Sequence, residues 1–204
     1  FEALLDNTKG EREISAFLGD HPHVLYWTLC RGAGHSRFVF REFPFGSSYV
    51  ADFAVVNSYS GVWEVFFVEL EPVDSKLFTK AGVPTNRVAG AIKQIDDWRM
   101  YLEGNKAGVR ADLVRWAKNK DLLGYSDGKD PCNYSNNRLS DPTTVLIDRY
   151  WMFAGRRNLT PSDDLARKAT FSPGRHIEIA TYDRMLDLVR MRYKNKESWT
   201  KGNS

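Results

Sequence analysis

The stretch YVADFAVVNSYSGVWEVFFVEL, residues 49–70, decides the fold of this chain. Its two ends, residues 49–56 and 63–70, are runs of β-branched and aromatic residues, a composition that favours strands. Residues 57–61 lie between them and are rich in turn-forming types. The sequence therefore predicts an antiparallel hairpin whose two strands are neighbours in a sheet.

Acidic side chains interrupt both strands of this hairpin. Asp52 lies between Ala51 and Phe53, and Glu69 follows a run of apolar residues. A carboxylate in such surroundings is costly unless it is paired, hydrogen-bonded or bound to a cation. Glu71 comes two residues after Glu69, so on a strand the two share a face, roughly 7 Å apart. We expect Asp52, Glu69 and Glu71 to converge at one end of the sheet.

Three converging carboxylates repel one another unless a cation lies among them, and oxygen ligands suit Mg²⁺ or Mn²⁺. Such an ion polarises a phosphodiester and lowers the pKa of bound water, which is what phosphodiester hydrolysis requires. The pattern predicts Asp52, Glu69 and Glu71 as metal ligands and catalytic residues. The alternative is that Asp52 or Glu69 forms a buried ion pair with an arginine.

The elements around the hairpin predict an α/β chain of the α+β type, with helices packed on a mixed sheet. Helical spacing of apolar residues is found up to residue 18, at 86–103 and at 183–193. Further strands are expected at residues 24–29, 37–43, 143–154 and 177–181, and short helices around Leu113 and Leu165.

A chain of 204 residues fits one domain, residues 1–204. Residues 104–142 hold the short helix around Leu113 and then a Gly, Asn, Ser and Asp run, which indicates an insertion or surface loop. The chain begins with Phe1 rather than Met, so we expect a domain excised from a longer protein, or the loss of the first residues.

The composition indicates a cytoplasmic protein with no membrane partner. No stretch approaches the ~18 apolar residues of a membrane span, and no basic-then-apolar leader is present. The two cysteines, Cys30 and Cys132, make neither a disulfide framework nor a zinc spacing. A net charge of +3 permits a nucleic-acid partner without requiring one.

Several short motifs follow one another in a fixed order. They are ADF at residues 51–53, ELEP at 69–72, LFTK-x-G at 77–82, QI-x-DW at 94–98, GRR at 155–157 and IATYD at 179–183. Together they resemble the PD-(D/E)XK nuclease superfamily and, more specifically, the nuclease domain of the Shedu anti-phage defence proteins. The similarity runs from about Glu11 to Leu188 and is broken mainly by residues 104–142.

The resemblance implies a restriction-endonuclease-like fold and a metal-dependent DNA endonuclease that forms a homo-oligomer, a tetramer. It also implies that Gln94 lies beside the metal site, where its amide orients water or a phosphate; the alternative is a solvent-facing amide. Arg156 and Arg157 follow a strand, and arginine suits phosphates, so these two and Lys93 are candidate DNA contacts. Glu13 is a candidate further ligand or a surface acid.

One departure from the family pattern concerns Glu71, which stands where the usual motif has a lysine. That lysine would steady the attacking water and the charge on the phosphate, and a carboxylate cannot do the second task. Glu71 could accept a proton or hold a second metal ion, with Lys80 or Lys93 as the catalytic cation. The alternative is a catalytically silent DNA-binding or sensing module of the same fold; a glycosidase based on Glu69 and Glu71 is a weaker third.

Overall fold

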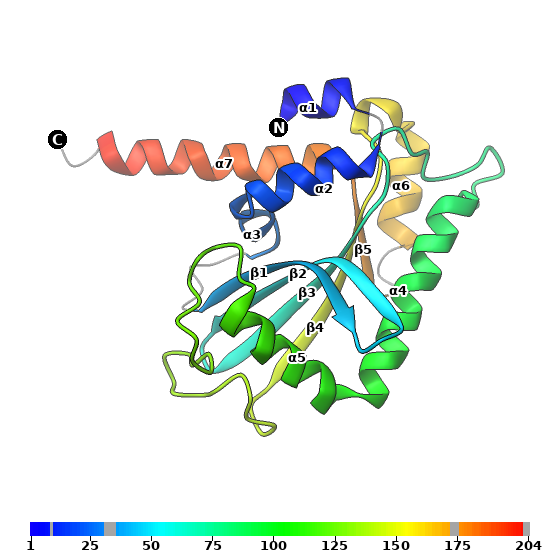
Figure 1. Ribbon diagram of the computed structural model, residues 1–204. Coiled ribbons are helices and arrows are strands. Elements are labelled where there is room, and N and C mark those ends of the chain that lie inside the picture. The colour runs from blue at the N-terminus through cyan, green and yellow to red at the C-terminus, as the bar shows by residue number, and fades with distance from the viewer. Residues whose placement is uncertain (9, 31–35, 172–175, 202–204) are drawn as a thin grey trace.

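The computed structural model describes residues 1–8, 10–30, 36–171 and 176–201 of the chain (Figure 1). Its helices are α1 (Glu2–Asn7), α2 (Glu11–Asp20), α3 (His23–Leu29), α4 (Asn86–Gly104), α5 (Lys106–Asn119), the 3-10 helix η1 (Arg157–Leu159), α6 (Ser162–Phe171) and α7 (Tyr182–Lys201). Its strands are β1 (Arg37–Phe45), β2 (Tyr49–Tyr59), β3 (Val62–Leu70), β4 (Leu146–Phe153) and β5 (Ile177–Ala180). Within these residues, no helix is both long and apolar enough to cross a membrane.

The described strands form one mixed sheet in the order β1-β2-β3-β4-β5. β1, β2 and β3 are antiparallel, whereas β4 and β5 run parallel to β3. A two-residue turn joins β2 to β3, and both of its residues, Ser60 and Gly61, have positive φ, as a type I′ turn requires. The predicted hairpin and the predicted mixed sheet are therefore confirmed.

Helices cover both faces of the sheet (Figure 1). On one face, Phe43 and Phe67 belong to a core that includes Trp98 of α4 and Leu113 of α5. The other face packs against α2, α3 and α7, for example through Leu18 and Met185 together with Phe53. The alternation of apolar side chains on the strands supplies both cores, which confirms the prediction of a sheet flanked by helices.

Two predicted elements near the N-terminus are wrong. Residues 24–29 form α3 rather than a strand, because Leu25, Tyr26 and Leu29 lie on one helical face and are buried against the sheet. Packing of that face overrides the strand preference of the local composition. Residues up to 18 form two helices instead of one, since Thr8 is extended after α1.

The later elements match the prediction more closely. The helix expected at 86–103 is α4, the strand expected at 177–181 is β5, and the closing helix is α7. The strand expected from residue 143 begins only at Leu146, and α5 ends at Asn119, before the loop that leads to β4. β1 extends through Pro44, which an edge strand tolerates because its outer N–H groups need no partner.

The regular alternation of side chains breaks at the same level in β1 and β2. Phe40 and Phe43 of β1 belong to the same core although they are three residues apart, and so do Ala51 and Ala54 of β2. A regular strand would return to the same face every two residues. Both strands therefore change phase together, and the tip of their hairpin bends toward α4 (Figure 1).

Glu42 and Asp52 lie at this break. Glu42 has a φ of +56°, which is uncommon for a residue with a side chain. The register on either side is kept, with Arg41 opposite Phe53 and Phe43 opposite Ala51. The two strands thus share the local distortion, and Asp52 lies at the point where the alternation of β2 changes phase.

The ends of β3 and β4 are held together by main-chain hydrogen bonds. Glu71 N–H donates to Phe153 O at 2.8 Å, and Gly155 N–H donates to Pro72 O at 3.2 Å. Gly155 has a φ of +66°, and a Cβ at this position would lie 2.4 Å from Ser75 O. Only glycine fits where the chain leaves β4.

We expect Gly155→Ala to destabilise the protein more than Gly124→Ala. Both glycines have positive φ, so both alanines incur roughly 1–2 kcal/mol of backbone strain. No atom lies within 4 Å of a Cβ at Gly124, whereas the clash at Gly155 should cost roughly 1–3 kcal/mol more. Denaturant unfolding measures the difference, and equal losses in the two variants would contradict it.

Candidate active site

The acidic residues singled out from the sequence meet where β3 ends. Asp52 Oδ2 accepts a hydrogen bond from Leu70 N–H at 2.7 Å, which joins β2 to the end of β3. Glu69 is buried, and its Oε2 accepts a hydrogen bond from Gln94 Nε2 of α4 at 3.1 Å. The structure therefore brings Asp52, Glu69 and Gln94 together, and Glu71 follows directly after β3.

α4 lies along the carboxylates because its N-terminus is anchored. Thr85 caps the helix by accepting from Val88 N–H, and its hydroxyl donates to Lys76 O at 2.9 Å. Arg87 and Gln94 are two turns apart and therefore share one stripe of α4. Arg87 Nε lies 3.8 Å from Glu71 Oε2, so this stripe presents one side chain to each glutamate.

Burial raises the pKa of all three carboxyl groups, and nearby acids raise these pKa values further. Burial is the largest cause for Glu69, whose pKa rises to about 9 with further contributions from Asp52 and Glu71. The pKa of Glu71 rises to about 7 through burial and the charge of Glu11, although Arg87 lowers it. Burial raises the pKa of Asp52 to about 6 despite the hydrogen bond from Leu70. Without a cation, the cluster holds protons at neutral pH.

Residues 8–186 match the family model described as Shedu protein SduA, C-terminal. The chain belongs to this Shedu family. A comparison with curated proteins found no match. Membership of the family suggests a role in anti-phage defence.

A fourth acid contributes to the electrostatics of the Shedu site. Glu11, in the first turn of α2, raises the pKa of Asp52, Glu69 and Glu71. Glu13, which the sequence suggested as a further ligand, instead accepts a hydrogen bond from Thr8. Glu11 and Glu13 are two residues apart in α2, about 200° around the helix, and therefore lie on nearly opposite faces of it.

Tyr182 supports the site from the opposite face of the sheet. Its hydroxyl donates to the main-chain oxygen of Glu71 at 2.7 Å, and its ring stacks on Phe153. It is fully buried, and burial together with the negative charge of the four acids raises its pKa, so it stays neutral. The IATYD motif contains this residue, but nothing in the motif indicates that its hydroxyl bonds to Glu71.

The two lysines proposed as catalytic cations, as the structure describes them, are exposed and make no ion pair with the three carboxylates. Lys93 Nζ lies 2.9 Å from Asp97 Oδ2 and is exposed, and it lies about 100° around α4 from Gln94. Lys80 is exposed in the loop between β3 and α4. Among the described residues, neither lysine forms an ion pair with Asp52, Glu69 or Glu71. The roles predicted for them remain predictions.

Arg87 was missed by the sequence analysis, although one signal was available. It lies seven residues before Gln94, a separation that places two residues on one stripe of a helix. Its pairing with Glu71 needed the position of α4 relative to β3, which the sequence does not supply.

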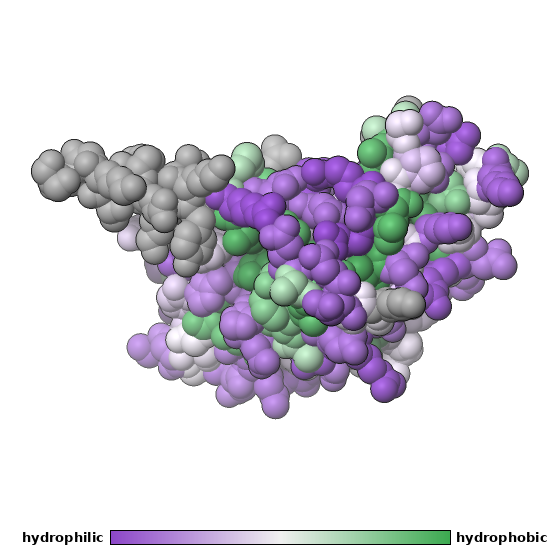
Figure 2. Space-filling model, turned by 90° about the horizontal axis from the view of Figure 1, so that it is seen from above, coloured by the Kyte–Doolittle hydropathy of each residue, from purple (hydrophilic) through white to green (hydrophobic). Residues whose placement is uncertain are grey.

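Arg156 and Arg157 engage acids within the domain. Buried Arg156 donates to Asp6 at 2.9 Å and to Asp183 at 3.0 Å, and Arg157 pairs with Asp187 at 2.5 Å. Seen from the side of α1, α2 and α7, hydrophilic residues cover the centre of the molecule and hydrophobic patches flank it (Figure 2). DNA contact by the two arginines stays a prediction, with Arg156 already occupied by two carboxylates.

The three carboxylates have the ligand atoms that a hard cation prefers, although their side chains are not arranged around a common point. Within the described ranges, no three acidic, histidine or cysteine side chains are placed so that they could hold a metal ion. Asp52, Glu69 and Glu71 instead face a main-chain N–H, an amide and a guanidinium. All three are oxygen donors that repel one another, which is the set that Mg²⁺ or Mn²⁺ would stabilise.

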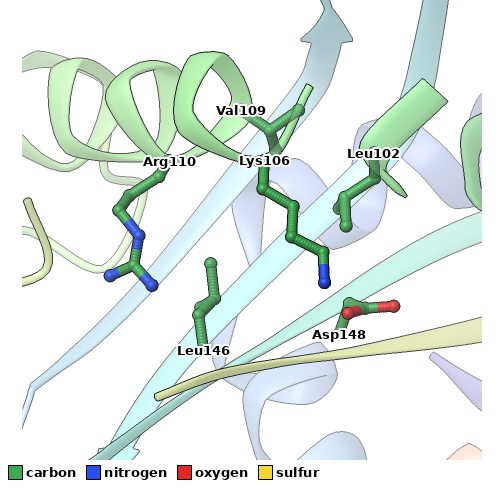
Figure 3. Close-up of a pocket in the computed structure, with 6 residues that line it drawn as sticks. All are labelled: Leu102, Lys106, Val109, Arg110, Leu146 and Asp148. Atoms are coloured by element: carbon green, nitrogen blue, oxygen red, sulfur yellow. The ribbon is translucent and has the colours of Figure 1, made fainter. Parts of the chain in front are cut away.

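A separate hollow lies where β4 begins, at the other end of the sheet (Figure 3). Lys106 extends toward Asp148 there, while Arg110 donates to the main-chain oxygens of Leu139, Asp141 and Thr144. Arg110 thereby fixes the loop after α5 to the helix. The hollow is remote from the carboxylates, because Leu146 pairs with Trp63 at the start of β3.

The raised pKa of Glu69 predicts that the metal-free protein loses stability as pH rises. Between its ordinary value of 4.5 and about 9, the native carboxyl keeps its proton while the unfolded one loses it. Unfolding then releases a proton and is favoured by higher pH. We expect Glu69→Gln to raise the unfolding free energy at pH 8 by roughly 1–3 kcal/mol.

Denaturant unfolding in EDTA at pH 5 and pH 8 measures this effect. Glu103→Gln is the matched control, because Glu103 is an exposed acid on the same helix as Gln94. A wild-type stability that rises between these pH values in parallel with that of Glu69→Gln would contradict the protonated state of Glu69.

Proposed function

We propose that this Shedu domain is a Mg²⁺- or Mn²⁺-dependent DNA endonuclease of the PD-(D/E)XK type that acts in anti-phage defence. The observation that carries the proposal is the gathering of Asp52, Glu69 and Glu71 with Gln94 at one end of a mixed sheet. Buried acids with strongly raised pKa values that share one end of a sheet mark a functional site more often than a structural one.

The fold supports the same conclusion. Three antiparallel strands are followed by α4 and then by β4, which returns parallel to β3. This order supports the proposal, because the PD-(D/E)XK layout also takes an acid from one strand, acids from the end of the next and an amide from the helix that follows. A fold alone does not define an activity, so the proposal rests on the residues of the site.

The chain's own residues have distinct tasks in the proposed hydrolysis. Asp52, Glu69 and Glu71 would hold the cation, which when bound polarises the phosphodiester and lowers the pKa of water. Gln94 orients the Glu69 carboxylate, and Tyr182 fixes the main chain at Glu71. Glu71 has two alternative tasks: it ligates the ion, or it accepts the proton of the attacking water. The water oxygen bonds to phosphorus as the bond to the leaving sugar oxygen breaks, and that oxygen takes a proton from solvent water.

DNA is the proposed partner. The family resemblance supports a homo-oligomer, a tetramer, and the composition supports a cytoplasmic protein. The competing function is a silent DNA-binding or sensing module. Its motivation is specific: Glu71 occupies the position of the usual lysine, and both candidate lysines are exposed. DNA binding without cleavage in the assay below would favour it.

Asp52→Asn and Glu69→Gln should reduce metal-dependent cleavage of DNA by roughly 10²–10⁴-fold, because each removes a ligand and a charge while keeping the side-chain shape. Cleavage of supercoiled and linear DNA with Mg²⁺ or Mn²⁺, against EDTA, measures the effect. Glu103→Gln, exposed on α4, should cleave like the wild type. Full activity in either site variant would remove that residue from the metal site.

Binding of Mn²⁺ at pH 7 should release protons, because ligating carboxylates must be ionised and the pKa of Glu69 lies near 9 in the metal-free domain. Titration calorimetry in two buffers with different ionisation enthalpies counts those protons. Affinity should increase with pH and fall roughly 10–100-fold in Asp52→Asn. Binding that neither releases protons nor depends on Asp52 would place the ion elsewhere.

A further inference from the structure

We propose that Arg87 binds a phosphate of the DNA backbone and so supplies the positive charge that Glu71 cannot. This inference rests on the proposed function, since it assigns a DNA contact to the same site. It is carried by the position of Arg87 beside Glu71, by the free donors of its guanidinium and by the open space next to it on α4.

Arg87 is a basic side chain beside Glu71, the acid that follows β3. Its Nε lies 3.8 Å from Glu71 Oε2, and Glu71 stands where the usual motif has a lysine. The neighbouring Glu69 is already engaged by Gln94, two turns further along the same stripe. The guanidinium therefore stands next to the acid that ligates the ion or takes the proton from water.

The geometry of this pair leaves Arg87 available to a ligand. A separation of 3.8 Å is an ion pair and is too long for a hydrogen bond. The side chain of Arg87 is 57% exposed, whereas that of Glu71 is 13% exposed, so the guanidinium is the part of the pair that reaches solvent. A guanidinium can donate to two phosphate oxygens at once, which an ammonium cannot do with fixed geometry.

Other cations near the site are less available. Lys93 is hydrogen-bonded to Asp97 at 2.9 Å. Arg41, whose charge lowers the pKa of Asp52, lies 4.0 Å from Glu42 and packs against Gly19 of α2. Arg87 combines proximity to Glu71 with exposure, and this combination decides between them.

The surface of α4 beside Arg87 is open. Gly90 lies between Arg87 and Gln94 along the helix, and a Cβ at this position would meet no atom within 4 Å. Glycine has no side chain, so it leaves the helix backbone uncovered at this position. A phosphate-bearing strand could approach the helix backbone at Gly90 and reach the guanidinium without displacing a side chain.

The test compares Arg87→Ala, Arg87→Lys and Arg115→Ala. Arg115 is the matched control, an exposed arginine paired with an acid, Asp112, on α5. We expect Arg87→Ala to lose roughly 100-fold in cleavage rate with Mn²⁺. In EDTA, the slope of log affinity for a DNA duplex against log salt should become shallower by about one. Arg87→Lys should recover the slope but only part of the rate, and Arg115→Ala should keep both.

The salt slope separates phosphate binding from a purely structural role. Arg87→Ala with a reduced rate but an unchanged slope would show that Arg87 only positions Glu71 and would overturn the proposal. So would an unaffected Arg87→Ala alongside an inactive Lys80→Ala or Lys93→Ala. If the wild type binds DNA without cutting it, the endonuclease function fails, and the slope alone still decides the role of Arg87. If it does not bind DNA at all, both proposals fail.

Discussion

Asp52, Glu69 and Glu71 meet at the end of β3, and the free energy of keeping three carboxyl groups there constrains the structure around them. A different group stabilises each carboxylate: Leu70 N–H donates to Asp52, the Gln94 amide donates to Glu69, and the Arg87 guanidinium lies beside Glu71. Those groups come from β3 and α4, so the cluster cannot form unless the strand and the helix are correctly placed. Partial neutralisation by protons completes the balance, because burial disfavours the charged forms.

The main chain behind the cluster is held as firmly as its side chains. β3 continues as an irregular segment whose hydrogen bonds run to Phe153 and Gly155 at the end of β4 and to the hydroxyl of Tyr182. On the other side, the shared break of alternation in β1 and β2 places Asp52 at the level where β3 ends. Features that depart from regular strand geometry thus gather at the site, as is usual where function competes with regular packing.

The sequence predicted the parts of the fold and site that depend on local pattern. The hairpin followed from two apolar runs around a turn, which anticipated that Asp52 and Glu69 would meet, and α4 followed from its periodic apolar face. The position of Gln94 beside them was implied by the family resemblance. Arg87 and Glu11 escaped notice because their effect depends on how α4 and α2 lie against the sheet. α3 was mistaken for a strand for a related reason: burial of Leu25 and Leu29 on one helical face outweighs the local preference.

The protonation of the cluster links its stability to its proposed chemistry. Without a cation, the fold is favoured by a neutral Glu69, because burial and the charges of the neighbouring acids disfavour its ionised form. A divalent ion would reverse this preference, because a ligating carboxylate must be charged.

The protons held by the cluster would then be exchanged for the ion. Glu71, with a pKa of about 7, is the group that lies nearest to half-protonation at neutral pH in the metal-free cluster. An ionised glutamate at this position can accept a proton from water, which a protonated lysine cannot do. Replacing the lysine transfers the binding of negative phosphate to a neighbouring cation, and the guanidinium of Arg87 stands where that charge is needed.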